Sequence, residues 1–100
     1  PVQARVLPIS ERQHEYAQQV LAKLLEAGIR AELDSRSEKV GYKIREGQLQ
    51  KIPYLLIVGD KEDEQGAVAV RHRKQGDLGA APLTDFITRI TEEIKEKTYD

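Results

Sequence analysis

The longest uninterrupted apolar run in the chain is the five-residue segment at 54–58, Tyr-Leu-Leu-Ile-Val. A strand that is apolar at every position is typical of the centre of a sheet whose two faces are both covered. A membrane-spanning helix needs about 20 apolar residues, so this run is too short to form one. The sequence therefore predicts a sheet with helices packed on both faces.

The residues before this run predict a strand followed by a helix. Residues 4–9 read as a short strand, and Ser10 and Gln13 have the spacing of a capping box that begins a helix. An apolar stripe at helical spacing follows, formed by Ala17, Val20, Leu21, Leu24 and Leu25. Gly28 comes just after the stripe and can end the helix in the left-handed conformation.

A second strand and a weaker helix are predicted next. Residues 29–33 alternate in polarity as a half-buried strand does, residues 34–37 form a polar loop, and residues 38–51 are helix-like. Gly41 and Gly47 lie inside that helix, and each disfavours it by about 1 kcal/mol relative to alanine. Close packing on the sheet would explain them, and so would a ligand that approaches the helix backbone.

The remaining residues predict a charged turn at 60–66, a strand at 67–73, a loop at 76–79 and a last helix with Pro82 in its first turn. The apolar stripe of this helix is Leu83, Phe86, Ile87, Ile90 and Ile94. We expect residues 95–100 to form a frayed tail. Strands that alternate with helices in this order indicate an α/β domain with a mostly parallel sheet and one strand added by a hairpin.

Length and termini point to one domain taken from a longer polypeptide. One hundred residues are enough for a single small domain, here 1–100. The first residue is proline rather than methionine, so we interpret the chain as a piece of a longer protein or a processed product. It has no cysteine, which excludes disulfides and thiolate chemistry and is typical of a cytoplasmic protein.

The sequence gives little support for a catalytic function. The two histidines, His14 and His72, have no metal-binding or catalytic spacing, and no phosphate-binding glycine-rich loop occurs. We expect His14 to be solvated and His72 to be packed on the valine side of its strand. The acidic residues at 60–64 lack the pattern of a calcium loop, although they could bind a cation.

The charge distribution is more informative than the net charge of −1, which results from 16 basic and 17 acidic residues. Basic residues gather at 36–51 and at 71–74, whereas acidic residues gather at 60–64 and in the last helix. Arg71 and Arg73 lie two apart on a strand and so share a face, while Lys39 and Lys43 share one side of a helix. Two readings stay open: ordinary solvated faces, or a basic surface for a nucleic acid.

A long motif indicates which reading to pursue. The run from Asp34 to Glu62, DSRSEKVGYKIREGQLQKIPYLLIVGDKE, closely resembles the C-terminal anticodon-binding domain of the threonyl-tRNA synthetase family. The segments at 7–9 (LPI), 68–73 (VAVRHR) and 76–79 (GDLG) continue the resemblance over essentially the whole chain. The related domains of prolyl-, histidyl- and glycyl-tRNA synthetases share the fold and are the nearest alternatives.

The resemblance implies a three-layer α/β/α domain with a mixed, mostly parallel sheet of about five strands and three helices. It also implies recognition of the tRNA(Thr) anticodon, especially its middle guanine and third uracil. ATP, Mg and Zn belong to the catalytic domain of the parent enzyme, so we expect no cofactor and no catalysis in this chain. We further expect a monomeric domain in the cytoplasm, with no membrane partner.

The family's anticodon contacts fall on Ser37, Lys39, Arg45, Glu62 and Arg71 of this sequence. Further RNA contacts are predicted at Arg36, Lys43 and Arg73. Arginine forks and carboxylates can read base edges, and unstacked anticodon bases expose such edges. Many family members carry asparagine at the position of Ser37, and serine keeps a donor and an acceptor without the bidentate amide.

Two other classes of function remain open from the sequence. A protein-interaction domain could reuse this fold without reading RNA, and a small enzyme could use the acidic turn.

Overall fold

The apolar run forms β3 (Tyr54–Val58), the central strand of the sheet, in the computed structural model, which describes residues 1–98. All its residues are buried except the half-buried Ile57. The five strands lie in the order β2-β1-β3-β4-β5. The prediction of a central strand covered on both faces is therefore confirmed.

The sheet is mixed. The other strands are β1 (Ala4–Pro8), β2 (Ala31–Leu33), β4 (Ala67–His72) and β5 (Gly76–Pro82). β1 pairs in parallel with β2 and β3, whereas β4 pairs antiparallel with β3 and β5. The sheet thus has two parallel and two antiparallel pairings, which corrects the expectation that most of it is parallel.

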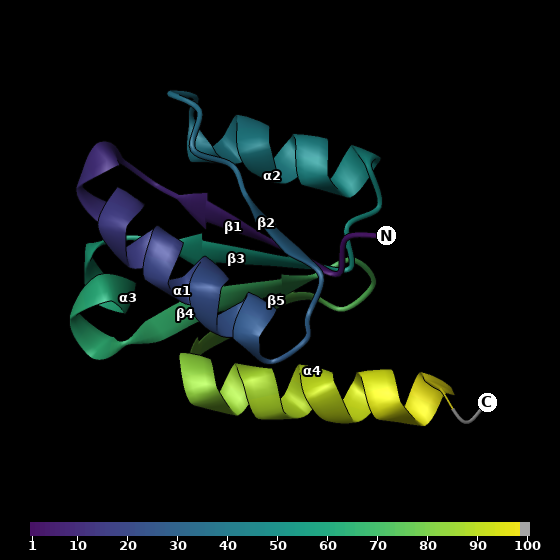
Figure 1. Cartoon of the computed structure of the whole chain (residues 1–100). Coiled ribbons are helices and arrows are strands. Elements are labelled where there is room, and N and C mark those ends of the chain that lie inside the picture. Colours follow the sequence, from purple (N-terminus) through teal and green to yellow (C-terminus); the bar gives the residue numbers. More distant parts are fainter. Residues whose placement is uncertain (99–100) are drawn as a thin grey trace.

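Helices cover both faces and give the predicted three layers (Figure 1). α2 (Val40–Leu49) lies on one face, while α1 (His14–Glu26) and α4 (Leu83–Thr98) lie on the other. A single turn of 3-10 helix, η1 (Glu11–Gln13), precedes α1. The side chain of Gln13 accepts hydrogen bonds from the Ser10 amide and hydroxyl, both at 2.9 Å, so the predicted helix start is confirmed.

Alternate residues of β3 pack in two separate hydrophobic cores, one on each face of the sheet. Leu56 and Val58 pack with α1 and α4, and Leu55 packs with the residues around α2. Gly47 of α2 lies directly over Leu55, because a Cβ placed on Gly47 would lie 2.6 Å from Leu55 Cδ2. Of the two explanations for this glycine, close packing on the sheet is therefore the one the structure supports.

Three predictions about local structure are wrong. Residues 60–65 form a short helix, α3 (Asp60–Gln65), instead of a turn, and Gly66 ends it in the left-handed conformation with φ 64°. Residues 76–79 belong to the edge strand β5, which continues to Pro82 before α4 begins. Residues 95–98 continue α4, and the last part of the predicted tail, 99–100, lies outside the described residues.

Candidate nucleic-acid interface

The loop between β2 and α2 carries two of the five predicted anticodon contacts. Ser37 and Lys39 are both exposed there, and Lys39 is the residue just before α2 begins. Together with Ile9, Glu11 and His14 from the connection between β1 and α1, they line a cavity of about 310 Å³. Among the described residues, neither the Ser37 nor the Lys39 side chain bonds to a protein group, so both are available to a ligand.

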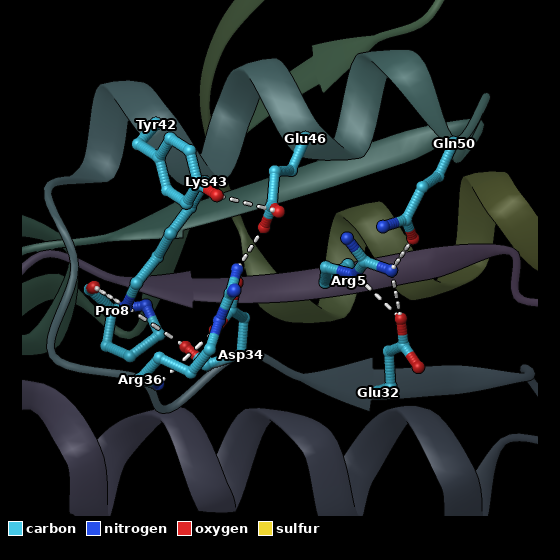
Figure 2. Close-up of polar contacts among 9 residues, drawn as sticks. All are labelled: Arg5, Pro8, Glu32, Asp34, Arg36, Tyr42, Lys43, Glu46 and Gln50. Carbon is cyan, nitrogen blue, oxygen red and sulfur yellow. Dashed lines mark hydrogen bonds and ion pairs between the residues drawn. The ribbon is translucent and has the colours of Figure 1, made fainter.

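Arg36, in the same loop, is held by two carboxylates (Figure 2). Its Nε donates to Asp34 Oδ1 at 2.9 Å, and its Nη2 donates to Asp34 Oδ2 at 2.8 Å and to Glu46 Oε1. The guanidinium carbon lies 5.8 Å from the centre of the Tyr42 ring, and the Tyr42 hydroxyl donates to Glu46 Oε2 at 3.1 Å. We call Asp34, Arg36, Tyr42 and Glu46 the Arg36 cluster.

The two carboxylates and the guanidinium group of the cluster are ionised at neutral pH. The hydrogen bonds from Arg36 hold the pKa of the Asp34 carboxyl below its ordinary value, and they do the same for Glu46. The two carboxylates in turn raise the pKa of Arg36. Arg36 is a predicted RNA contact, but its guanidinium group is already bonded to two carboxylates of the protein, although the side chain is half exposed.

The Lys43 side chain extends from α2 toward Pro8 and Asp34 (Figure 2). This side chain is 2% exposed, and Nζ donates to the backbone oxygens of Asp34 at 3.1 Å and Pro8 at 3.3 Å. Burial lowers the pKa of this ammonium group. Lys43 is a predicted RNA contact, yet its ammonium group is already bonded inside the protein, because the side of α2 that Lys43 occupies is turned onto the end of β1.

The other end of α2 is tied to the sheet by Arg5, on β1. Its Nε donates to Glu32 Oε1 on β2 at 2.6 Å, and its Nη2 donates to Gln50 Oε1 at 2.5 Å (Figure 2). α2 is thus anchored near its start by Lys43 and just beyond its end by Gln50. The helix that carries Arg45 is fixed relative to the strands.

Glu62 lies on α3, close to the cavity. Its Oε1 accepts a hydrogen bond from the Gly59 amide at 2.8 Å, which fixes the carboxylate at the start of the helix. The side chain of Ile9, 49% exposed, both lines the cavity and approaches Gly59. Ile9 therefore connects the surface of Ser37 and Lys39 to that of Glu62.

Arg45 and Arg71 flank the α2 side of the sheet. Arg71 is half buried on β4, opposite Leu55 of β3 and Asp77 of β5. Because Leu55 belongs to the core beneath α2, Arg71 shares its face of the sheet. Arg45 is exposed on α2, two residues before Gly47, which packs on Leu55.

The predicted contacts thus do not form a single cluster. Ser37, Lys39 and Glu62 lie near the carboxyl ends of β1 and β3, whereas Arg71 lies beside Leu55 near the start of β3 and Arg45 is exposed on α2. Arg71 is the fifth residue of β4, about 13 Å along the strand from its first residue. Arg73 follows directly after β4, and it differs from Arg71 in being bonded to the protein: its amide donates to Pro53 O at 2.9 Å and its Nη1 to Lys51 O at 3.4 Å.

The acidic segment and His72 serve the fold. Asp60 accepts hydrogen bonds from Arg12 Nη2 at 2.8 Å and Gln13 Nε2 at 2.5 Å, which join α3 to η1. His72 packs edge-on against Tyr54, with ring centres 4.9 Å apart, which confirms that it is packed. The described residues contain no group of three or more metal-ligating side chains placed to share an ion, and no helix there is long and apolar enough to cross a membrane.

Several residues that line the cavity are absent from the predicted contacts, among them Ile9 and His14. Ile9 continues the apolar pattern of β1, so nothing in the sequence marks it as an exposed residue. His14 lies at the start of a helix, where a solvated histidine is the ordinary case. Only the fold reveals that the loop before α2 passes close to both.

Comparison with known families shows which family the chain belongs to. The family described as the anticodon binding domain matches residues 3–93. The chain belongs to this family. Membership in this family is consistent with a surface whose polar and charged side chains project from α2, β4 and the loop before α2.

Relatives within the anticodon binding domain family carry more specific names. The chain is 66% identical over 97 residues to the threonine-tRNA ligase of Syntrophomonas wolfei, covering 97% of this chain and 15% of that protein. It is similar to the RNA binding domain of threonyl-tRNA synthetase from Cryptosporidium parvum, with TM-score 0.87, 32% identity and coverage of 92% of this chain and 23% of that one. A prolyl-tRNA synthetase from the same organism follows with TM-score 0.85 and 25% identity, covering 96% of this chain and 21% of that one.

The anticodon binding domain described here therefore spans only a small part of its curated relatives, 15% of the length of the first. Its fold agrees with the three-layer architecture that the sequence resemblance implies.

Proposed function

We propose that this chain is the anticodon-reading domain of a threonyl-tRNA synthetase and that it binds the anticodon loop of tRNA(Thr). The observation that carries the proposal is the 66% identity, over nearly the whole chain, to a threonine-tRNA ligase. Among the solved structures, the threonyl-tRNA synthetase domain is also more similar to the chain, at 32% identity, than the prolyl-tRNA synthetase, at 25%, so a prolyl-specific domain is not favoured.

The proposed contacts are Ser37, Lys39, Arg45, Glu62 and Arg71. Arg71 can present two parallel donors to a guanine edge or to a uracil carbonyl. Glu62 has one oxygen fixed by the Gly59 amide, and its second oxygen can accept a hydrogen bond from a base amino or imino group. Lys39 and Arg45 are exposed and suit phosphates or base acceptors.

Base selection fits a domain with a net charge of −1 better than tight binding does. Most of the affinity of proteins for nucleic acids comes from neutralised phosphates, and this domain offers few unpaired cations for that purpose. We propose that the rest of the parent enzyme supplies most of the tRNA affinity, together with the aminoacylation site and its ATP, Mg and Zn. In that arrangement the chain itself is a non-catalytic, monomeric cytoplasmic module that binds no cofactor.

The test is a titration of the chain with two RNA stem-loops that differ in one base. One carries the tRNA(Thr) anticodon and the other has its middle guanine replaced. The proposal predicts tighter binding of the first, and equal affinity for the two would contradict it.

A protein-interaction domain is the second candidate, favoured by Leu49, which is 76% exposed on α2, and by the exposed ring of Tyr42. Salt distinguishes the two, because RNA binding weakens as salt rises, whereas an apolar protein contact does not. A partner bound equally well at low and high salt, with no affinity for either stem-loop, would favour the second candidate.

A further inference from the structure

We propose that the Arg36 cluster is a positioning device, which holds the 35–39 loop in the conformation that presents Ser37 and Lys39 to RNA. The inference rests on the proposed function, and it assigns to Arg36, Asp34 and Glu46 a role other than direct contact.

The loop is tied at its beginning. The Asp34 side chain is 7% exposed, its amide donates to Val6 O at 3.0 Å, and its own carbonyl accepts from Lys43. Its carboxylate receives the Arg36 amide at 3.2 Å as well as the guanidinium. Asp34 therefore fixes both the backbone and the side chain of Arg36.

Glu46 joins the loop to the second turn of α2. It bonds to Arg36 while it accepts from the Tyr42 hydroxyl, so the guanidinium lies between the loop and the helix (Figure 2). The next turn of the loop closes when the Glu38 amide donates to Arg36 O at 2.9 Å. Ser37 thus lies between two residues whose backbones are hydrogen-bonded to fixed groups.

The Arg36 cluster places negative charge beside the proposed RNA contacts, where it would repel the phosphates of RNA. Two carboxylates, Asp34 and Glu46, surround the one arginine beside the proposed contacts. If charge alone mattered, removing Glu46 would help a polyanion to bind. If Glu46 positions the loop, removing it weakens binding, so the two accounts predict opposite signs.

Glu46→Gln is the informative variant, and Glu38→Gln is its matched control. Glu38 is an exposed carboxylate in the same loop whose side chain bonds to no protein group within the described residues. We expect Glu46→Gln to weaken binding of the tRNA(Thr) anticodon stem-loop about threefold to tenfold, as when the binding-competent loop falls to roughly 10–30% of the population. Glu38→Gln should leave binding unchanged or tighten it by less than about twofold, because charges on this surface are screened.

The salt dependence of binding separates positioning from contact. Lys39→Gln should lower the slope of log K against log salt by about 0.7 if Lys39 neutralises a phosphate. Arg36→Gln should weaken binding without changing that slope. A slope change for Arg36→Gln as large as that of Lys39→Gln would overturn the proposal, as would Glu46→Gln binding that is unchanged, tighter or no weaker than that of Glu38→Gln.

Amide hydrogen exchange of the RNA-free chain distinguishes failure of this inference from failure of the proposed function. The Glu38 amide should exchange faster in Glu46→Gln than in the wild type, while the amides of β3 stay equally protected. If the wild type binds neither stem-loop, the proposed function is wrong and the exchange result still tests the positioning. Equal exchange of the Glu38 amide in both proteins would overturn the positioning role.

Discussion

Two glycines on α2 provide a quantitative test of how closely this helix approaches β3. A Cβ on Gly47 would meet Leu55 Cδ2 at 2.6 Å, Cδ1 at 3.0 Å and Cγ at 3.3 Å. A Cβ on Gly41 would meet no atom within 4 Å. Both residues lie in the same helix, so the two alanine variants compare the same chemical change with and without steric overlap.

The magnitudes follow from two opposing effects. Alanine gains up to about 1 kcal/mol over glycine in a helix, and we expect about 0.5 kcal/mol at Gly41 because it lies in the first turn. At Gly47 the gain is opposed by overpacking, which typically costs about 1–3 kcal/mol when the neighbour cannot move away. Leu55 is only 3% exposed, so it has little room to move. Gly47→Ala should therefore be less stable than the wild type by about 1 kcal/mol, and Gly41→Ala more stable by about 0.5 kcal/mol.

Urea unfolding followed by circular dichroism measures both free energies on the same chain. The denaturant slope should be unchanged in both variants, since the surface exposed on unfolding is the same. A Gly47→Ala variant as stable as Gly41→Ala would refute the reasoning, because it would show that α2 does not lie within contact distance of Leu55.

Three further predictions concern buried or strained groups. Burial, with a smaller contribution from the hydrogen bond to Glu93, raises the pKa of Tyr54 to about 12, so the folded state keeps a proton that the unfolded state loses near pH 10. The free energy of unfolding should therefore fall as the pH rises from about 10 to 12. The difference in unfolding free energy between the wild type and Tyr54→Phe should shrink over the same range. Parallel pH profiles of unfolding free energy for the two proteins would contradict this. Both Lys43→Ala and Lys43→Met remove the ammonium group, but only Lys43→Ala removes the buried methylene groups. Lys43→Ala should therefore be less stable than Lys43→Met by about 2 kcal/mol in urea unfolding. Equal stabilities would show that the methylene groups of Lys43 are not packed. Gly66→Ala should lower the melting temperature through strain at φ 64°, equivalent to about 1 kcal/mol, and an unchanged melting temperature would argue against the left-handed end of α3.

Patterns that depend on burial were readable from the sequence. The apolar run of β3 contributes to both cores, and most of the predicted stripes of α1 and α4 pack in one of them, so the predicted layers are correct; Leu25 of the α1 stripe is 52% exposed. The long motif supplied the strand count and the family. These features share a cause, namely that a buried face needs apolar residues at the period of its element.

The missed elements lack that signal. α3 contains no apolar residue, and it depends on the Gly59 amide, Glu62 and the left-handed Gly66. β5 is an exposed edge strand with two glycines at positive φ, and its partner β4 has an irregular register at Val70/Arg71. Neither element presents a periodic apolar face, so neither could be predicted from periodicity.

Charge patterns located the proposed site but could not assign each residue's role. Lys39 and Lys43 look equivalent in the sequence, yet one is exposed and the other is 2% exposed with its ammonium on two carbonyls. Arg36 looked like a contact, but it bonds to Asp34 two residues before it and to Glu46 on α2, which only the fold brings beside it. Whether a cation faces a ligand or the protein depends on tertiary contacts that spacing does not encode.

Base discrimination by Arg71, compared with that by Arg73, tests the central claim most directly. The two arginines lie two residues apart at the same end of β4, but the Nη1 of Arg73 donates to Lys51 O. The ratio of affinities for the tRNA(Thr) anticodon stem-loop and for the loop with its middle guanine replaced should fall in Arg71→Ala by a factor equivalent to about 1–3 kcal/mol. The same ratio should be unchanged in Arg73→Ala. A wild type that binds both loops equally, or an Arg71→Ala variant that loses the same affinity for both, would contradict the account.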